Sequence, residues 1–239
     1  LDDGAPPQGH HLRRLQGQPL QPLQRAAATQ PVATGVRAID ALLTLARGQR
    51  IGIFAGSGVG KSTLVNAMAR HMDADLKIIC LVGERGREAA EYWRHNVPES
   101  ERARTVLVAS TSEQPAVLRV RAVNLALVLA EHYREAGRHV LFMMDSITRY
   151  AMALREIGLA IGEPPTARAY TPSVFAALPR VVERCGAQAS GGAITAVFSV
   201  LAESDDIEDP LSDVMRSLLD GHIVLSRTLA EQGDRKSVV

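Results

Sequence analysis

Residues 50–63 read Arg50-Ile51-Gly52-Ile53-Phe54-Ala55-Gly56-Ser57-Gly58-Val59-Gly60-Lys61-Ser62-Thr63. An apolar run with β-strand character, Ile51 to Ala55, breaks into a glycine-rich turn, and a helical pattern begins directly after it. Gly56, Gly58 and Gly60 permit positive φ angles and let the backbone approach an anion without a Cβ in the way. Backbone N–H groups of the turn and of the first helical turn then converge on phosphate oxygens, helped by the helix dipole. The stretch therefore predicts a strand, a phosphate-binding loop and a helix.

The end of this loop carries the two side chains that a nucleoside triphosphate requires. We expect Lys61 to reach the β- and γ-phosphates of ATP and the Ser62 hydroxyl to coordinate Mg²⁺. The strict motif has a glycine five residues before Gly60, where this chain has Ala55. The predicted nucleotide-binding residues of the loop are Ala55, Gly56, Ser57, Gly58, Val59, Gly60, Lys61, Ser62 and Thr63.

The composition is typical of a globular α/β protein. The chain has 239 residues, enough for one large domain, and its 46% apolar content can fill a core although aromatic residues make up only 4%. The net charge of +1 gives no global signal for nucleic acid or an anionic membrane surface. Cys80 and Cys185 each have apolar neighbours, as buried reduced thiols do. Neither a signal peptide nor an apolar run of about eighteen residues is visible, so we expect a cytoplasmic protein.

Strand-type and helix-type segments alternate along the chain. Residues 1–34 contain five prolines and are predicted to form an extended connector. Further strands are predicted at residues 76–82, 105–109, 140–144, 193–201 and 222–225. Helices are predicted at residues 60–71, directly after residue 88, and at 115–136, 151–157, 174–183 and 214–219, with a long loop at 158–171. This alternation indicates βαβ units with right-handed crossovers, and we predict an α/β fold of the RecA-like P-loop type, a mostly parallel twisted sheet with helices on both faces.

Charged residues follow two of the predicted strands directly. Asp145 closes the strand at 140–144, so its carboxylate should emerge at the carboxyl edge of the sheet and hold Mg²⁺ through its water shell, although an Asp here can also cap a helix. Glu84 follows the strand at 76–82 and could orient the water that attacks the γ-phosphate. Arg85 and Arg87 on the same turn could neutralise charge on that phosphate. The alternative for this turn is a solvated charge cluster.

Five blocks of the sequence resemble those of the flagellar and type III secretion export ATPases, relatives of the catalytic subunit of rotary ATP synthases. The blocks are residues 55–62, Val82-Gly83-Glu84-Arg85-Gly86-Arg87-Glu88, Asp145-Ser146-Ile147-Thr148-Arg149-Tyr150, Arg155-Glu156-Ile157-Gly158-Leu159-Ala160-Ile161-Gly162-Glu163-Pro164-Pro165 and Asp220-Gly221-His222-Ile223-Val224-Leu225-Ser226-Arg227. They occur in the order of the family, and the similarity runs from about residue 15 to residue 233. Ala55 agrees with this family, so the departure from the strict loop motif supports the resemblance.

The resemblance implies a protein-exporting, Mg-dependent ATPase that works as a homo-hexamer with its sites between subunits. It assigns these roles: phosphate binding to Lys61, Mg²⁺ binding to Ser62, activation of the water to Glu84, contact with the γ-phosphate to Arg85, the outer shell of the metal to Glu88, the Walker B position to Asp145 and nucleotide binding to Arg149.

The resemblance also implies partners. These are a central stalk protein, a stator or regulator, export-gate proteins and chaperone–substrate complexes, with no nucleic acid and at most a peripheral position at the inner membrane. The acidic turn Asp205-Asp206-Ile207-Glu208-Asp209-Pro210 occupies the place where the ATP synthase relatives touch the rotating stalk. The alternative for this turn is a solvated loop.

The family pattern extends beyond this chain at both ends. The family has an N-terminal β-barrel, of which residues 1–34 would be the remaining connector, and the ATPase core would be residues 35–233. Residues 234–239 match no part of the pattern, so Arg235 is not interpreted as the arginine finger of the family. We therefore expect the chain to be a fragment that holds most of one catalytic core.

Other functions compete with this interpretation. A catalytic subunit of ATP synthase usually has Thr where this chain has Ser62. A hexameric RNA translocase needs a basic surface, which the near-neutral charge does not offer. A non-catalytic nucleotide-binding subunit of a hexameric ring would lack the carboxylate at Glu84. Flagellar and virulence-type export cannot be separated from these residues.

Overall fold

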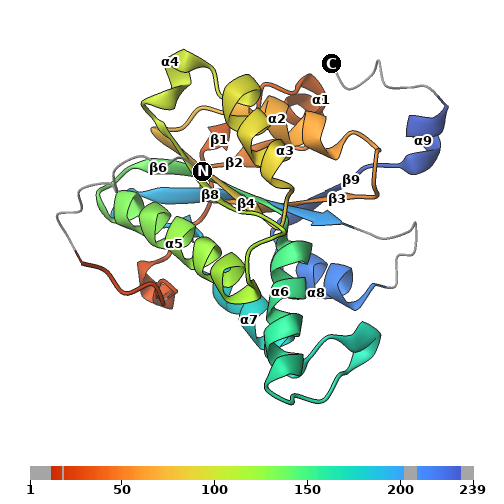
Figure 1. Cartoon of the computed structure of the whole chain (residues 1–239). Helices are drawn as coiled ribbons and strands as arrows, with labels where there is room; N and C mark the ends of the chain where they lie inside the picture. Colours follow the sequence, from red (N-terminus) through yellow and green to blue (C-terminus); the bar gives the residue numbers. More distant parts are fainter. Residues whose placement is uncertain (1–11, 18, 202–208, 233–239) are drawn as a thin grey trace.

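A computed structural model describes residues 12–17, 19–201 and 209–232. Its centre is a sheet between two layers of helices (Figure 1). The strands are β3 (Arg50–Ala55), β4 (Leu76–Val82), β5 (Thr105–Ser110), β6 (His139–Asp145), β8 (Ala193–Leu201) and β9 (Gly221–Val224). They lie in the order β5-β4-β6-β8-β3-β9 and every neighbouring pair is parallel, while the two-residue strand β7 (Gly186–Ala187) runs antiparallel to the start of β8. The predicted doubly covered parallel sheet is confirmed.

The helices cover both faces of the sheet (Figure 1). One layer holds α1 (Arg37–Leu42), α2 (Lys61–His71), α3 (Gly86–Glu91), the π-helix that continues it (Tyr92–Asn96) and α4 (Glu99–Arg102). The other layer holds α5 (Ala116–Glu135), α6 (Ile147–Ala160), α7 (Pro172–Val182) and α8 (Pro210–Leu218). Helix α9 (Arg227–Glu231) follows the edge strand β9, and two 3₁₀ turns lie at Pro22–Gln24 and Ala167–Ala169.

Alternate residues of each inner strand point into two separate hydrophobic cores. Phe142 and Met144 of β6 pack in the core beneath α5 to α8, whereas Leu141 and Met143 pack in the core beneath α1 to α3. Because both faces are covered, these strands are continuous apolar runs with no polar alternation. Each fully buried side chain of this kind stabilises the fold by about 1.5 to 3 kcal/mol.

Helices α6 and α8 of the second layer start four residues earlier than the apolar pattern predicts. Helix α6 begins at Ile147 because the Ser146 side chain accepts a hydrogen bond from the Arg149 backbone N–H, and it continues to Ala160. The prediction of a loop from residue 158 is therefore wrong for its first three residues. Gly158 fits there because α6 packs closely on the start of α7, where a Cβ would lie 2.4 Å from Thr171 Oγ1. Helix α8 begins at Pro210 because Asp209 caps it.

The segment before residue 35 contacts the amino edge of the core. Strand β1 (Pro31–Val32) pairs with β2 (Leu45–Ala46), and the Arg25 guanidinium lies 2.7 Å from the Glu183 carboxylate. Glu183 also pairs with Arg50, the first residue of β3, whose guanidinium reaches Asp220 at 2.7 Å as well. These ion pairs fix the start of β3 beside β9 and α7. None of the helices in the described residues combines the length and apolarity that a bilayer crossing requires.

Candidate nucleotide-binding site

The glycine-rich loop leaves β3 and opens onto a cavity of about 790 Å³ at the carboxyl edge of the sheet. Gly58 and Gly60 have φ angles of +79° and +97°, and Gly60 is the N-cap of α2. A Cβ at either position would meet no atom within 4 Å, so glycine is required here by the backbone conformation, while the space in front of the loop stays open for a ligand. Residues 56–63 all line the cavity, whereas Ala55 is buried behind it at the end of β3.

Lys61 is held inside this cavity by an ion pair. Its ammonium group contacts Asp145 Oδ1 and also lies 3.4 Å from Ser199 Oγ, and the Ser199 hydroxyl donates to the same Asp145 oxygen. The three residues meet because β8, which carries Ser199, lies between β3 and β6 in the sheet. The structure thus brings together Lys61 and Asp145, which were predicted as site residues. Ser199 was missed, and the signal for it is a hydroxyl near the end of an apolar strand.

Glu84 lies on the same cavity wall. Its Oε1 is 3.2 Å from Arg149 Nε, but the N–H is not aligned for a hydrogen bond, so the contact is electrostatic. The pKa of Glu84 is raised to about 7, mainly by burial of the side chain, which is 17% exposed, and also by the neighbouring Glu88 and Asp145. The charges of Arg149 and Lys61 oppose this rise. Glu84 therefore changes protonation state near neutral pH.

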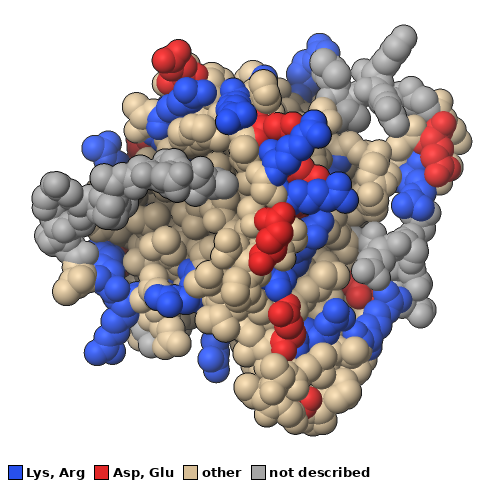
Figure 2. All heavy atoms as spheres, viewed as in Figure 1, with Lys and Arg blue, Asp and Glu red and all other residues tan. Residues whose placement is uncertain are grey.

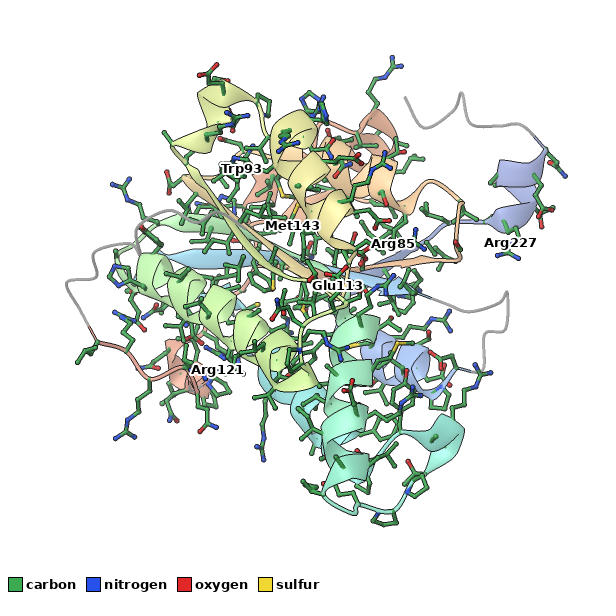
Figure 3. All side chains as sticks on the ribbon, in the orientation of Figure 1. Arg85, Trp93, Glu113, Arg121, Met143 and Arg227 are labelled. Atoms are coloured by element: carbon green, nitrogen blue, oxygen red, sulfur yellow. The ribbon has the colours of Figure 1, made fainter. Side chains whose placement is uncertain are left out.

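Arg85 lies at the foot of α3, outside the wall of the cavity (Figure 3). Its side chain is 83% exposed, and its Nε is 3.9 Å from the Glu88 carboxylate. The same helix carries a second exposed pair, Arg87 with Glu91, and charges of both signs are intermixed over this face (Figure 2). Glu88 itself lines the cavity. The guanidinium that contacts Glu84 belongs to Arg149 and not to Arg85. A contact of Arg85 with the γ-phosphate therefore stays a prediction.

The remaining walls of the cavity differ in polarity. The wall on α2, α3 and the π-helix is mostly polar, and it is formed by Asn66, Glu91, Tyr92 and Asn96. The opposite wall, around the ends of β8 and β9 and along α9, is mostly apolar, and it is formed by Leu201, Val224, Leu225, Ser226, Leu229 and Ala230. An apolar wall beside a phosphate-binding loop suits the flat base of a nucleotide. Sequence reasoning did not identify these residues.

The oxygen atoms in the cavity fit Mg²⁺. Ser62, Glu88 and Asp145 offer hydroxyl and carboxylate oxygens, the donors that this ion prefers. Within the described residues, no group of three or more His, Cys, Asp or Glu side chains is close enough to hold a metal by itself. In nucleotide sites Mg²⁺ is bound through one or two protein groups together with substrate phosphates and water.

The acidic turn predicted to face a partner is described only at its end. Residues 205–208 of this turn lie outside the described residues. Asp209 is buried, and its carboxylate accepts hydrogen bonds from the backbone N–H and the hydroxyl of Ser212. Asp209 therefore serves the start of α8.

Residues 35–238 match the family model described as the ATP synthase alpha/beta family, nucleotide-binding domain. The chain is 50% identical over 238 residues to the flagellum-specific ATP synthase of Bacillus subtilis, covering 100% of this chain and 54% of that protein. It is 50% identical to a type 3 secretion system ATPase of Pseudomonas syringae, covering 90% of this chain and 47% of that protein. The assembled ATPase EscN from enteropathogenic E. coli, solved in complex with its central stalk EscO, superposes with a TM-score of 0.89 at 46% identity, covering 99% of this chain and 56% of that one. The chain spans about half the length of these relatives.

Proposed function

The chain belongs to the ATP synthase alpha/beta family through its nucleotide-binding domain, and on this premise we propose that it is the ATP-hydrolysing core of a motor that energises flagellar or type III protein export. One observation carries the proposal. Glu84, whose pKa is raised to about 7, shares a cavity with the phosphate-binding loop and with Lys61 and Asp145. A subunit that only binds nucleotide does not need a carboxylate at this place.

Binding of ATP would begin with an exchange of partners at Lys61. The backbone N–H groups of residues 56–63 would surround the phosphates, and the ammonium group would leave Asp145 for the β- and γ-phosphates. The side chain of Lys61 is 10% exposed in its ion pair with Asp145, and the contact with the phosphates that replaces this pair would be a charge-assisted hydrogen bond, which is stronger than a neutral one.

Hydrolysis requires a water molecule in line with the bond to the leaving phosphate. Glu84 would orient this water and accept its proton, and a base with a pKa near the working pH is suited to that task. Arg149 would hold the carboxylate in position through its charge. Both residues lie at the carboxyl edge of the sheet, Glu84 in the turn after β4 and Arg149 in the first turn of α6.

Mg²⁺ would be held on the side of Ser62 and Asp145, with Glu88 in its outer shell. When bound, the ion neutralises negative charge on the β- and γ-phosphate oxygens. In the chain itself, Ser62 is in the first turn of α2 and Asp145 ends β6, so both groups come from rigid elements that meet at the cavity.

The proposal extends to the assembly. We propose that copies of the complete protein form a hexameric ring, in the cytoplasm and at most peripheral to the inner membrane, and that a central stalk protein contacts its inner wall. EscN, with the same fold over 99% of this chain, was solved as an assembled ATPase with a central stalk. Both a flagellar and a type III secretion protein are 50% identical to this chain, and this identity does not favour one apparatus over the other.

Nucleotide binding is tested by calorimetric titration of the chain with Mg-ATP. Lys61→Ala should raise the Kd by about 10- to 100-fold, the range expected for a lost hydrogen bond to a charged group. The control Arg121→Ala removes an exposed cation on α5, away from the cavity, and should leave the Kd unchanged (Figure 3). Equal affinities of the wild type and Lys61→Ala would refute the assignment of the phosphate-binding loop.

Hydrolysis is tested in the complete, assembled protein. Glu84→Gln keeps the shape of the side chain, so it should bind ATP while its turnover falls by about 10²- to 10⁴-fold. A variant that retained half of the wild-type turnover would show that another residue activates the water.

A further inference from the structure

Ser199 is a hydroxyl residue in the most buried strand of the sheet, and its side chain ends at the ion pair of the nucleotide site. It is 1% exposed and lies opposite Ile53 of β3 in the parallel register. A buried hydroxyl without hydrogen-bond partners lowers the stability of the fold by about 1 to 3 kcal/mol, so the partners of Ser199 explain how the fold accommodates it there. Its proton goes to Asp145 Oδ1 at 2.5 Å, and its oxygen accepts from Lys61 Nζ at 3.4 Å.

We propose that Ser199 is a positioning residue that holds the Asp145 carboxylate in its metal-binding orientation after Lys61 has moved to the phosphates. The inference rests on the proposed function. In the structure Asp145 Oδ1 has two donors, Lys61 and Ser199. Once the ammonium group leaves, the Ser199 hydroxyl is the donor that remains.

The geometry gives the two oxygens of Asp145 different tasks. Both donors contact Oδ1, and among the described residues no hydrogen bond to Oδ2 is found. A carboxylate that is fixed through one oxygen leaves the other oxygen free toward the cavity. There it could coordinate a metal ion or accept a hydrogen bond from a water molecule bound to that ion. Groups that hydrogen-bond a metal-binding carboxylate orient it in this way, and their loss typically weakens metal binding or activity by about 10- to 100-fold.

The hydroxyl also affects the competition for Lys61. Without it, the departure of Lys61 would leave Oδ1 with no donor in a site that is largely shielded from water, which disfavours the nucleotide-bound arrangement. The expected defect therefore depends on the metal. Binding of ATP together with Mg²⁺ needs an oriented Asp145, whereas binding of ATP alone does not.

The test is calorimetric titration of the chain with ATP, once with excess Mg²⁺ and once with EDTA. In Ser199→Ala the affinity gained from Mg²⁺ should fall by about 10- to 100-fold, with the affinity in EDTA changed by less than about threefold. The half-saturating Mg²⁺ concentration at saturating ATP should rise by the same factor. Ser199→Thr keeps the hydroxyl and should restore both values, and Ser199→Cys, with a weak donor of similar size, should show the same defect in case the alanine variant does not fold.

Thr195→Val is the matched control. It removes another fully buried hydroxyl from β8, one that contacts His139 at the amino edge of the sheet, at 2.7 Å. It should lower the unfolding temperature without changing the Mg²⁺ dependence. If Ser199→Ala binds like the wild type, or loses equal affinity with and without Mg²⁺, the positioning role is refuted while the proposed function stands. If the wild type fails to bind Mg-ATP any better than Lys61→Ala does, the proposed function itself fails.

Discussion

Replacing Glu84 by Gln should make the fold more stable at alkaline pH and leave it unchanged at acid pH. The Glu84 pKa rises from an ordinary 4.5 to about 7, mainly because the side chain is buried. Between these values the native state binds more protons than the unfolded state, so the stability that the protonated group contributes is fully present below pH 4.5 and is lost as the pH rises through 7. At 1.36 kcal/mol per pH unit, the rise amounts to about 3 kcal/mol.

Urea unfolding of both proteins, followed by circular dichroism from pH 5 to pH 8.5, measures this effect. The stability gained by Glu84→Gln should increase with pH, approach about 3 kcal/mol and level off above about pH 7.5. Glu91→Gln is a control without pH dependence in this range, because the Arg87 guanidinium lowers the pKa of the exposed Glu91 carboxyl below 4.5. Glu91 is therefore ionised in both the folded and the unfolded state from pH 5 to pH 8.5, and any stability difference of this variant should stay constant. Parallel curves for Glu84→Gln and the wild type would refute the raised pKa of Glu84.

Three further substitutions test buried contacts and backbone conformation in the fold. Glu131→Gln would leave the Arg184 guanidinium buried without its charge partner, since the two side chains are 8% and 4% exposed. The free energy of unfolding, measured in urea, should fall by about 3 to 5 kcal/mol, and a fall below about 1 kcal/mol would contradict this expectation. Gly192→Ala would place a Cβ 1.8 Å from the Arg134 carbonyl oxygen. The free energy of unfolding, measured by thermal unfolding, should fall by about 1 to 3 kcal/mol, and an unchanged midpoint would mean that residue 192 and the Arg134 backbone are further apart than described. Gly60→Ala would strain the backbone at a φ of +97° and should cost about 1 to 2 kcal/mol, which urea unfolding would measure and an unchanged stability would contradict.

The fold could be predicted where apolar runs were long. Strand β8 has the bounds expected from the sequence, because a run of nine residues, of which eight are buried, leaves little choice of boundary. The starts of α6 and α8 were placed too late because the polar caps Ser146 and Asp209 precede the apolar pattern. The two-residue strands at 31–32, 45–46 and 186–187 were missed because tertiary pairing creates them and no local pattern marks them.

The candidate site divides in the same way. The phosphate-binding loop is a local motif, so the conformation of residues 56–63 followed from their order alone. The contacts of Asp145 with Ser199 and of Glu84 with Arg149 depend on which strands are neighbours and in what register, and one sequence does not contain that information directly. Arg85 illustrates the limit, because its place beside Glu84 in the sequence did not place it on the cavity wall.

The position of β3 in the sheet has a consequence for biosynthesis. Its two neighbours are β8 and β9, so Arg50 finds its partner at Ala196 and Ile51 finds another at Gly221. When the phosphate-binding loop has emerged from the ribosome, more than half of the described length of the chain must still be synthesised before either strand that pairs with β3 is available. Contacts so distant along the chain are slow to form, because a long loop must close first. During this interval the apolar strand Arg50–Ala55 is exposed to aggregation, and a chain that stops before residue 193 would contain the complete loop motif without either of the strands that pair with β3.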